Sequence, residues 1–238
     1  MAKLKFLVTG SGRSGTNYMS RFLTSVGIMC GHESIFTHDG ITEAIYRLKE
    51  PQIVRTSSCS LKDKDDWFNS SLQVADSSYM SAPYLDDPIL KNTKIIHLIR
   101  NPIKVISSTY YDAKFFGEDN LIQSPYVDFV HGILPQLQGI KDRLEKNIMY
   151  YVLWNEMIEL KTKNKNVFVH RIENGITKDL FNFLEIKPTQ KYYNNKKTNS
   201  WNIRDRDLSF ENIEKSHISC LLYNFMQKYG YYPLKTLV

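Results

Sequence analysis

A short apolar run followed at once by a glycine-rich stretch restricts the fold of this chain more than any other feature. The run Lys3–Thr9 (KLKFLVT) predicts a buried β-strand, and Gly10–Asn17 (GSGRSGTN) follows it directly. Apolar residues at helical spacing then predict an α-helix over Asn17–Val26. A strand, a glycine turn and a helix in this order direct backbone N–H groups and the positive end of the helix dipole toward an anion. The beginning of the chain therefore predicts a phosphate-binding loop, with a purely structural glycine turn as the alternative.

The loop fits two nucleotide-binding patterns and completes neither. Read from Gly10 it spells G-x-G-x-x-G, but a dinucleotide site also needs an acidic residue at the end of a second strand, about 20 residues on. Glu33 is near that distance, yet Gly27–Glu33 (GIMCGHE) predicts a poor strand because glycines interrupt it. Read as G-x-x-x-x-G-K-[ST], the loop has Thr16 in place of the lysine, and its nearest cation is Arg13.

Further apolar runs extend the predicted sheet. Each precedes a segment with helical periodicity: Leu72–Asp76, Lys94–Ile99 and Asn166–Ile172. This alternation predicts an α/β fold with a central parallel sheet flanked by helices, in one domain over residues 1–238. Helices are expected over Ser124–Lys146 and Asn147–Lys161, and Lys187–Leu208 predicts a long loop. The polar and aromatic residues expected to pack inside these elements are His97, Trp154, Asn155 and His170.

Composition narrows the class of ligand and the compartment. A formal net charge of +6 favours an anionic ligand, with a basic surface that serves only solubility as the alternative. The lysines are scattered and make no basic arm for a nucleic acid polymer. The cysteines Cys30, Cys59 and Cys220 have neither metal-ligand nor disulfide spacing, which favours a reducing, cytoplasmic compartment. No run approaches the roughly 18 apolar residues of a membrane span, and the first run is too short for a signal peptide.

A second motif follows the run Lys94–Ile99. Arg100 comes at the expected carboxyl end of this strand, where open parallel sheets bind ligands. Ser107 and Ser108 follow about two helical turns into the next helix, so an arginine and a hydroxyl are expected to bind a second anionic group near the glycine loop. The alternative is a surface arginine with serines on a solvated helix face.

Together, RSGTN at Arg13–Asn17 and RNPIKVISS at Arg100–Ser108 resemble the ligand motifs of sulfotransferases that use 3′-phosphoadenosine 5′-phosphosulfate. In that family, [KR]-[ST]-G-T-[TN] binds the 5′-phosphosulfate and R-[ND]-P-x-x-x-x-x-S binds the 3′-phosphate. The resemblance implies a donor site without a metal, with 3′-phosphoadenosine 5′-phosphate as product. Arg100 and Ser108 would hold the 3′-phosphate. The 5′-phosphosulfate would be held by Gly12, Arg13, Ser14, Gly15, Thr16 and Asn17, with Arg13 beside the bridge at which charge develops.

The resemblance continues weakly toward the C-terminus. Val167–Lys187 looks like the family's Y-E-D-L segment followed by F-L-G, and Tyr229–Pro233 (YGYYP) is similar to its closing G-Y-x-P. The departures are Ile172 for the tyrosine, Asn174-Gly175 for Asp-Leu, and Glu185 for the glycine. These departures weaken the peripheral matches and leave the two ligand motifs intact.

Transfer to a hydroxyl or amine needs a base that takes the acceptor's proton. Some sulfotransferases carry a GEE-like segment at nearly this distance from the loop, whose second glutamate is the base. Matching Cys30–Glu33 (CGHE) to that segment makes Glu33 the candidate. His32 is the rival, since other members of the family use histidine. A solvated Glu33 and a capping His32 are the structural alternatives.

Other segments are expected near the reactants. Asp76, Ser77 and Ser78 end the second predicted strand at the same sheet edge, where the resemblance implies acceptor contacts. A corresponding family segment covers the nucleotide, which makes Lys197, Ser200 and Arg204 candidate contacts, with a solvated charge run as the alternative.

The sequence thus predicts a sulfotransferase acting on a small-molecule, carbohydrate, lipid or peptide acceptor. Two alternatives remain: a nucleoside-triphosphate-dependent kinase with a degenerate phosphate loop, and a non-catalytic module that binds an adenine nucleotide or an anionic polymer.

Overall fold

The computed structural model describes residues 4–49, 74–117, 124–187, 208 and 210–231. The chain divides into two compact units, each assembled from separate stretches. Unit 1 comprises Met1–Gly10, Gly15–Leu98 and Ile158–His170. Unit 2 comprises Ser11–Ser14, Ile99–Met157 and Arg171–Val238. The prediction of one domain over residues 1–238 stays a prediction.

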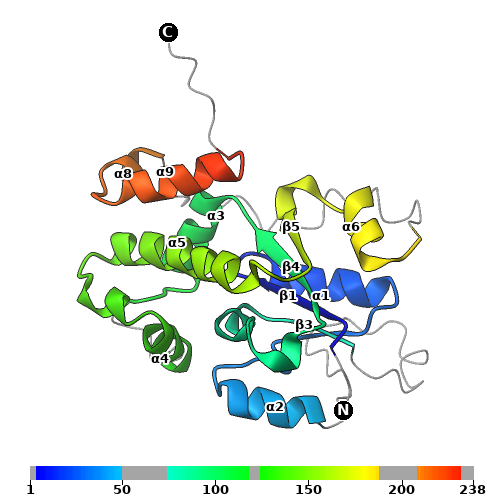
Figure 1. Cartoon of the computed structure of the whole chain (residues 1–238). Helices are drawn as coiled ribbons and strands as arrows, with labels where there is room; N and C mark the ends of the chain where they lie inside the picture. The colour runs from blue at the N-terminus through cyan, green and yellow to red at the C-terminus, as the bar shows by residue number, and fades with distance from the viewer. Residues whose placement is uncertain (1–3, 50–73, 118–123, 188–207, 209, 232–238) are drawn as a thin grey trace. The chain divides into compact units, whose positions relative to one another are not determined.

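A five-stranded, all-parallel sheet forms the centre of unit 1 (Figure 1). Its strands lie in the order β2-β3-β1-β4-β5. In chain order they are β1 (Phe6–Gly10), β2 (Cys30–His32), β3 (Ala75–Ser77), β4 (Lys94–Ile99) and β5 (Val167–Arg171), the last residues of β4 and β5 belonging to unit 2. β1 and β4 are buried along most of their length, as strands covered on both faces must be. The predicted α/β class, with a parallel sheet flanked by helices, is confirmed.

One strand contradicts the sequence prediction. Gly27–Glu33 was expected to be a poor strand, but Cys30–His32 within it forms β2 and pairs with β3 in parallel register, with Gly31 opposite Asp76. The Cys30 carbonyl also accepts hydrogen bonds from the side chains of Ser20 and Thr24. Tertiary partners therefore outweigh the low strand propensity of glycine in this short segment.

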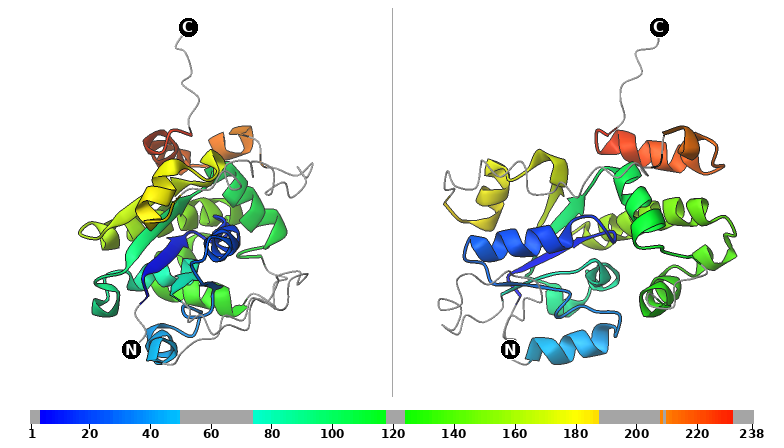
Figure 2. Two further views of the ribbon diagram at one scale, coloured as in Figure 1. Left: turned by 90° about the vertical axis from the view of Figure 1, so that its right-hand side faces the viewer. Right: turned by 180° about the vertical axis from the view of Figure 1, so that it is seen from behind.

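The helices of unit 1 follow from local signals. α1 (Thr16–Ser25) lies within one residue of the predicted helix and packs against β1, β2 and β3 (Figure 2). Its N-cap, Gly15, has φ 107°, a left-handed conformation that favours glycine. Unit 1 also contains α2 (Ile41–Lys49), the 3₁₀ turns η2 (Tyr79–Tyr84) and η3 (Pro88–Leu90), and the end of the helix Arg143–Thr162.

Unit 2 is largely helical. It contains α3 (Pro102–Ser107), the π-helical turn η4 (Ser108–Asp112), α4 (Ser124–Ile133), η6 (Pro135–Gly139), most of α5 (Arg143–Thr162), η7 (Ile172–Asn174), α6 (Lys178–Leu184), α8 (Phe210–Glu214) and α9 (Ser219–Lys228). The predicted helix Ser124–Lys146 is wrong, since α4 ends at Ile133. Pro135 disfavours a helical conformation at Leu134, whose φ and ψ are −122° and 71°.

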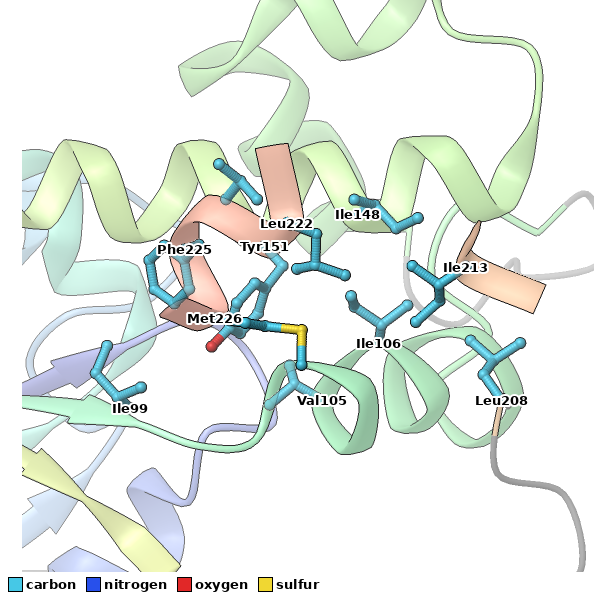
Figure 3. Packing of buried hydrophobic residues seen from close by; sticks show 11 residues of the cluster. Ile99, Val105, Ile106, Ile148, Tyr151, Leu208, Ile213, Leu222, Phe225 and Met226 are labelled. Carbon is cyan, nitrogen blue, oxygen red and sulfur yellow. The ribbon is translucent and has the colours of Figure 1, made fainter. Parts of the chain in front are cut away.

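Unit 2 has an apolar core of its own. Figure 3 shows its side chains close together, contributed by the end of β4, by α3, α5, α8 and α9, and by Leu208. The labelled residues are Ile99, Val105, Ile106, Ile148, Tyr151, Leu208, Ile213, Leu222, Phe225 and Met226. This core borders the second predicted ligand motif, because its member Ile99 directly precedes Arg100.

The expected packing residues are buried. His97 and His170 lie inside unit 1, and Trp154 and Asn155 lie inside unit 2. No helix in the described part of the chain is long and apolar enough to cross a membrane.

Candidate functional site

The segments that carry the two ligand motifs start from neighbouring positions of the sheet. Gly10 at the end of β1 and Leu98 near the end of β4 are partners in the parallel register. Directly after each of them the chain passes from unit 1 into unit 2. The loop Ser11–Ser14 and the segment that begins at Arg100 therefore belong to the same compact unit, and their contacts can be described together.

Three of the predicted donor-binding residues meet in unit 2. Arg13 Nε donates a hydrogen bond to Ser108 Oγ at 3.0 Å. Arg100 Nη1 donates to the carbonyl oxygen of Arg13, also at 3.0 Å. Two guanidinium groups and a hydroxyl are thus joined by hydrogen bonds at one stretch of loop. Guanidinium groups in particular bind phosphate and related oxyanions in proteins. We call Ser11, Arg13, Ser14, Arg100 and Ser108 the anion group.

The contact between Arg13 and Ser108 modifies the sequence prediction. Arg13 was expected beside the phosphosulfate and Ser108 beside the 3′-phosphate, as separate contacts. In the structure one hydrogen bond joins the two side chains. Ser108 Oγ also donates to Asp112 Oδ2 at 3.1 Å, which places a carboxylate in the same network.

Two serine hydroxyls complete the anion group. Ser11 and Ser14 are 0% and 1% exposed, and their side-chain oxygens have no hydrogen-bond partner among the described residues. Leaving a buried hydroxyl unsatisfied costs about 1–3 kcal/mol, so such groups occur where a ligand or solvent completes the bonding. Their position in the loop after β1 fits donors to an oxyanion. Ser11 was not among the predicted contacts.

The backbone of the loop is held under constraint. Gly12 N–H donates to the Tyr150 hydroxyl at 2.9 Å, and a Cβ at Gly12 would lie 3.0 Å from that oxygen. A side chain at this position would require the Tyr150 hydroxyl to shift by a few tenths of an ångström. Through its bond to Tyr150, the Gly12 amide is engaged by the protein. The next residue, Arg13, has φ 69°, which is unfavourable for a residue with a side chain. Strained backbone of this kind is concentrated at functional sites.

The end of the loop and the start of α1 belong to unit 1. Thr16 Oγ1 lies 3.2 Å from His32 Nε2, and the Thr16 carbonyl accepts a hydrogen bond from Ser77 Oγ at 2.8 Å. Asn17 is exposed in the first turn of α1. The N-cap of α1 makes no side-chain hydrogen bond, so the first amides of the helix keep the anion-binding character of a helix N-terminus.

The two candidate bases lie next to each other in unit 1. His32 Nε2 and Glu33 Oε1 are 3.9 Å apart, and Glu33 has φ 51°. Burial, followed by the charge of Asp76, raises the pKa of Glu33 to about 7. Burial, followed by the charge of Arg21, lowers the pKa of His32 to about 4. A general base works best when its pKa is near the operating pH, which favours Glu33 over His32.

Asp76, Ser77 and Ser78 are fully buried, and all three side chains bond to the protein. The Asp76 carboxylate accepts from the hydroxyl of Ser34 and from the amides of Ser34, Ile35 and Phe36, at 2.9–3.3 Å. Ser78 Oγ donates to the Phe36 carbonyl at 2.7 Å. These bonds fix the turn that follows Glu33. All three side chains are thus engaged by the protein, and the expected acceptor contacts by these residues stay a prediction.

The remaining predictions concern a cover segment and metals. Lys197, Ser200 and Arg204 lie outside the described residues. Within the described part of the chain, no three His, Cys, Asp or Glu side chains lie together as a metal site requires. That no metal takes part stays a prediction.

Sequence reasoning missed the tyrosines of α5. Tyr150 holds the Gly12 amide, and the Tyr151 hydroxyl donates to the carbonyl of Arg100 at 2.9 Å. The available signal was a pair of tyrosines in an otherwise apolar helical stretch, since a buried phenol needs a hydrogen-bond partner. Which partners they bond could not be read from the sequence.

A comparison with models of known protein families found no match, and a comparison with curated protein sequences found no significant match. The resemblance carried by the two motifs therefore stays a prediction.

Proposed function

We propose that this protein is a sulfotransferase that uses 3′-phosphoadenosine 5′-phosphosulfate and transfers its sulfuryl group to a hydroxyl or amine. The observation that carries the proposal is the hydrogen-bonded network of Arg13, Arg100 and Ser108 in unit 2. A phosphate-loop kinase would require a lysine after the last glycine of the loop, and this chain has Thr16 there. Arg13, the cation inside the loop, suits a phosphosulfate donor, because a guanidinium group can offset the negative charge of the donor.

The donor supplies an activated sulfuryl group with a phosphate as leaving group, and the residues of the anion group suit its two anionic ends. Arg100 and Ser108 are assigned to the 3′-phosphate. Arg13 and the hydroxyls of Ser11 and Ser14 are assigned to the phosphosulfate. The unpartnered buried hydroxyls of the two loop serines support this fit, since each lacks an acceptor among the described side chains and backbone.

Glu33 is assigned as the general base. Its pKa of about 7 gives it a substantial fraction of carboxylate at neutral pH, together with enough basicity to take a proton from an acceptor. His32, with its pKa lowered to about 4, is neutral at that pH and a much weaker base. His32 is instead assigned to hold Thr16, which its ring contacts.

The acceptor and the compartment belong to the same proposal. The acceptor is a small molecule, carbohydrate, lipid or peptide carrying a hydroxyl or amine, and the chain's net charge of +6 favours acceptors that are themselves anionic. A cytoplasmic location is supported by Cys30 and Cys220, which are free thiols.

Two measurements test the proposed function. Titration calorimetry without metal should give a much higher affinity for 3′-phosphoadenosine 5′-phosphate than for ATP. A screen of acceptors with labelled donor should then detect sulfuryl transfer. Preference for ATP, or a requirement for magnesium, would favour a kinase. Tight binding of the 3′-phosphorylated nucleotide without turnover on any acceptor class would favour a non-catalytic binding module.

A further inference from the structure

The peptide group between Arg100 and Asn101 is held at both of its polar atoms. The Tyr151 hydroxyl donates to the carbonyl oxygen of Arg100 at 2.9 Å. The Asn101 N–H donates to Glu173 Oε1 at 2.8 Å. These partners come from α5 and η7, far from residue 100 in the sequence, and both belong to unit 2. This junction between β4 and α3 is thus fixed by side chains instead of by a sheet or helix partner.

The carboxylate that holds Asn101 is itself held. The Tyr231 hydroxyl donates to Glu173 Oε2 at 2.5 Å, and it lies 3.4 Å from the carbonyl oxygen of Ile99. Its single proton goes to the carboxylate, because the shorter, charge-assisted bond is the stronger one. The guanidinium carbon of Arg171 lies 4.1 Å from the centroid of the Tyr231 ring. The carboxylate of Glu173 accepts one hydrogen bond at each oxygen, from the Asn101 amide and from the Tyr231 hydroxyl. These two bonds restrict rotation of the carboxylate.

Tyr231 remains a donor at neutral pH. Burial, followed by the hydrogen bond to Glu173, raises the pKa of the Tyr231 phenol. Burial likewise raises the pKa of Tyr151 well above its usual value. Both hydroxyls thus keep their protons across the physiological range, and the bonds they donate do not switch with pH.

The two hydrogen bonds anchor the backbone from which the Arg100 side chain extends. The peptide group is planar and rigid, so holding its carbonyl oxygen and its N–H restrains the position of the Arg100 Cα. The Arg100 guanidinium donates to the carbonyl of Arg13. A displacement of this backbone segment would therefore move the guanidinium away from the phosphate loop.

We infer that Tyr151, Glu173 and Tyr231 are positioning residues that fix Arg100 for a phosphate monoester, which we call the Arg100 clamp. The inference rests on the proposed function, since it deepens the role given there to Arg100. A long, flexible arginine loses conformational entropy when it binds, and fixing its backbone beforehand reduces that cost. The clamp also gives a common role to segments that are distant in sequence. Arg100 begins the second ligand motif, Tyr151 lies in α5, Glu173 lies in the segment Val167–Lys187, and Tyr231 lies in YGYYP.

A double-mutant cycle on the full chain tests the clamp, with affinity for 3′-phosphoadenosine 5′-phosphate as the readout. Glu173→Ala should weaken binding roughly fivefold, the effect of a lost hydrogen bond. In the Arg100→Ala background the same change should have almost no effect, because the group that Glu173 positions is gone. Tyr231→Phe, which keeps the ring and its packing, should show the same pattern. Glu156→Gln, at an exposed glutamate of α5, is the control and should change nothing.

Amide hydrogen exchange provides a readout without nucleotide. The Asn101 amide should exchange faster in Glu173→Ala than in the unaltered chain, while amides of α9 keep their protection. Equal losses of affinity in both backgrounds, or unchanged exchange at Asn101, would overturn the clamp while leaving the proposed function intact. Failure of the unaltered chain to bind the nucleotide would instead overturn the proposed function, and the positioning role with it.

Discussion

Arg100 of the anion group in unit 2 and the polar residues that end β3 in unit 1 were both expected at the carboxyl edge of the sheet, yet their surroundings differ. In unit 2, Arg13, Arg100 and Ser108 bond to one another or to the loop, and Arg13 stays exposed. In unit 1, Asp76 and Ser78 are buried and bond to a neighbouring turn. Position at the carboxyl edge of a parallel sheet therefore brings a polar residue near a site, but its partners decide whether it can meet a ligand.

Glu33 is the exception in unit 1. The amides of the turn after Glu33 donate to the carboxylate of Asp76. The charge of Asp76 is in turn the second cause, after burial, of the raised pKa of Glu33. The fixed turn and the titrating residue thus belong together. The comparison predicts that changes at Glu33 alter chemistry, changes at Asp76 alter stability, and changes in the anion group alter affinity.

The largest effect is expected for Glu33→Gln. Glutamine keeps the size of the side chain but cannot take a proton, and loss of a general base typically costs about 10²–10⁴ in rate. Affinity for 3′-phosphoadenosine 5′-phosphate should stay nearly unchanged. The measurement is turnover on an identified acceptor, with calorimetry in parallel. His32→Ala is the matched control and should cost much less; a collapse in that variant beside near-normal Glu33→Gln would transfer the base role to the histidine.

The rate of transfer should also depend on pH through Glu33. Its pKa of about 7 means that the carboxylate form is lost as the pH falls below that value. The rate should therefore drop about tenfold per pH unit between pH 6 and 5, and level off above pH 8. The residual rate of Glu33→Gln should lack this step. A profile of the unaltered enzyme that is flat from pH 5 to 8 would contradict the assignment.

The raised pKa of Glu33 also makes the stability of the fold depend on pH. Stability should fall as the pH rises, whereas the rate of transfer should rise. The pKa of Glu33 is raised from 4.5 to about 7 on folding, so the folded state binds this proton more tightly. The resulting stabilisation is present below about pH 4.5 and is lost as the pH rises through about 7. Glu33→Gln should therefore raise the unfolding midpoint at pH 8 relative to the unaltered chain, and less so at pH 4.

Asp76→Ala should act on stability instead of on binding. It leaves the amides of Ser34, Ile35 and Phe36 without their acceptor, and losses of this kind cost about 3 kcal/mol. Chemical denaturation measures the change, and nucleotide affinity of the folded fraction should stay within about twofold of the unaltered chain. A large loss of affinity with normal stability would return Asp76 to the binding site.

Much of the fold was predictable because its signals are local. The run before Gly10 and the run before Arg100 each form a buried strand, and the glycine loop leads into α1 as expected. β2 was not predictable, since its pairing with β3 and the hydroxyls of Ser20 and Thr24 make it a strand. Nor was the contact of Gly12 with Tyr150, because the two residues lie 138 positions apart.

The candidate site shows the same division. The two motifs predicted Arg13, Arg100 and Ser108 as donor contacts, and hydrogen bonds join these three residues in the structure. The buried bonds of Asp76 were hidden, since its partners lie about forty residues away and donate mainly through backbone amides, which leave no mark on composition. Reasoning from residue type predicts charged contacts better than it predicts what the backbone will bind.

Within unit 2, Arg100→Ala should weaken nucleotide binding about tenfold to a hundredfold, the range of a charge-assisted hydrogen bond. Because Arg13 bonds to Ser108, Arg13→Ala should weaken binding as well as slow transfer. The cycle of Arg13→Ala with Ser108→Ala should be non-additive in affinity. Strict additivity would restore the two separate roles expected from the motifs.

The smallest effect is expected at Asp112, whose carboxylate accepts a hydrogen bond from Ser108 Oγ. A 3′-phosphate on Ser108 would face this negative charge and compete with it for the same hydroxyl proton. Asp112→Asn removes the charge and keeps a hydrogen-bond acceptor, so affinity for 3′-phosphoadenosine 5′-phosphate should rise about twofold to fivefold, as expected for an exposed charge pair in water. Affinity for adenosine 5′-phosphate, which lacks the 3′-phosphate, is the control and should stay constant. The gain should shrink at high salt, where an exposed charge is screened. An equal gain for both nucleotides would show that Asp112 faces a group common to them, and would move the 3′-phosphate away from Ser108.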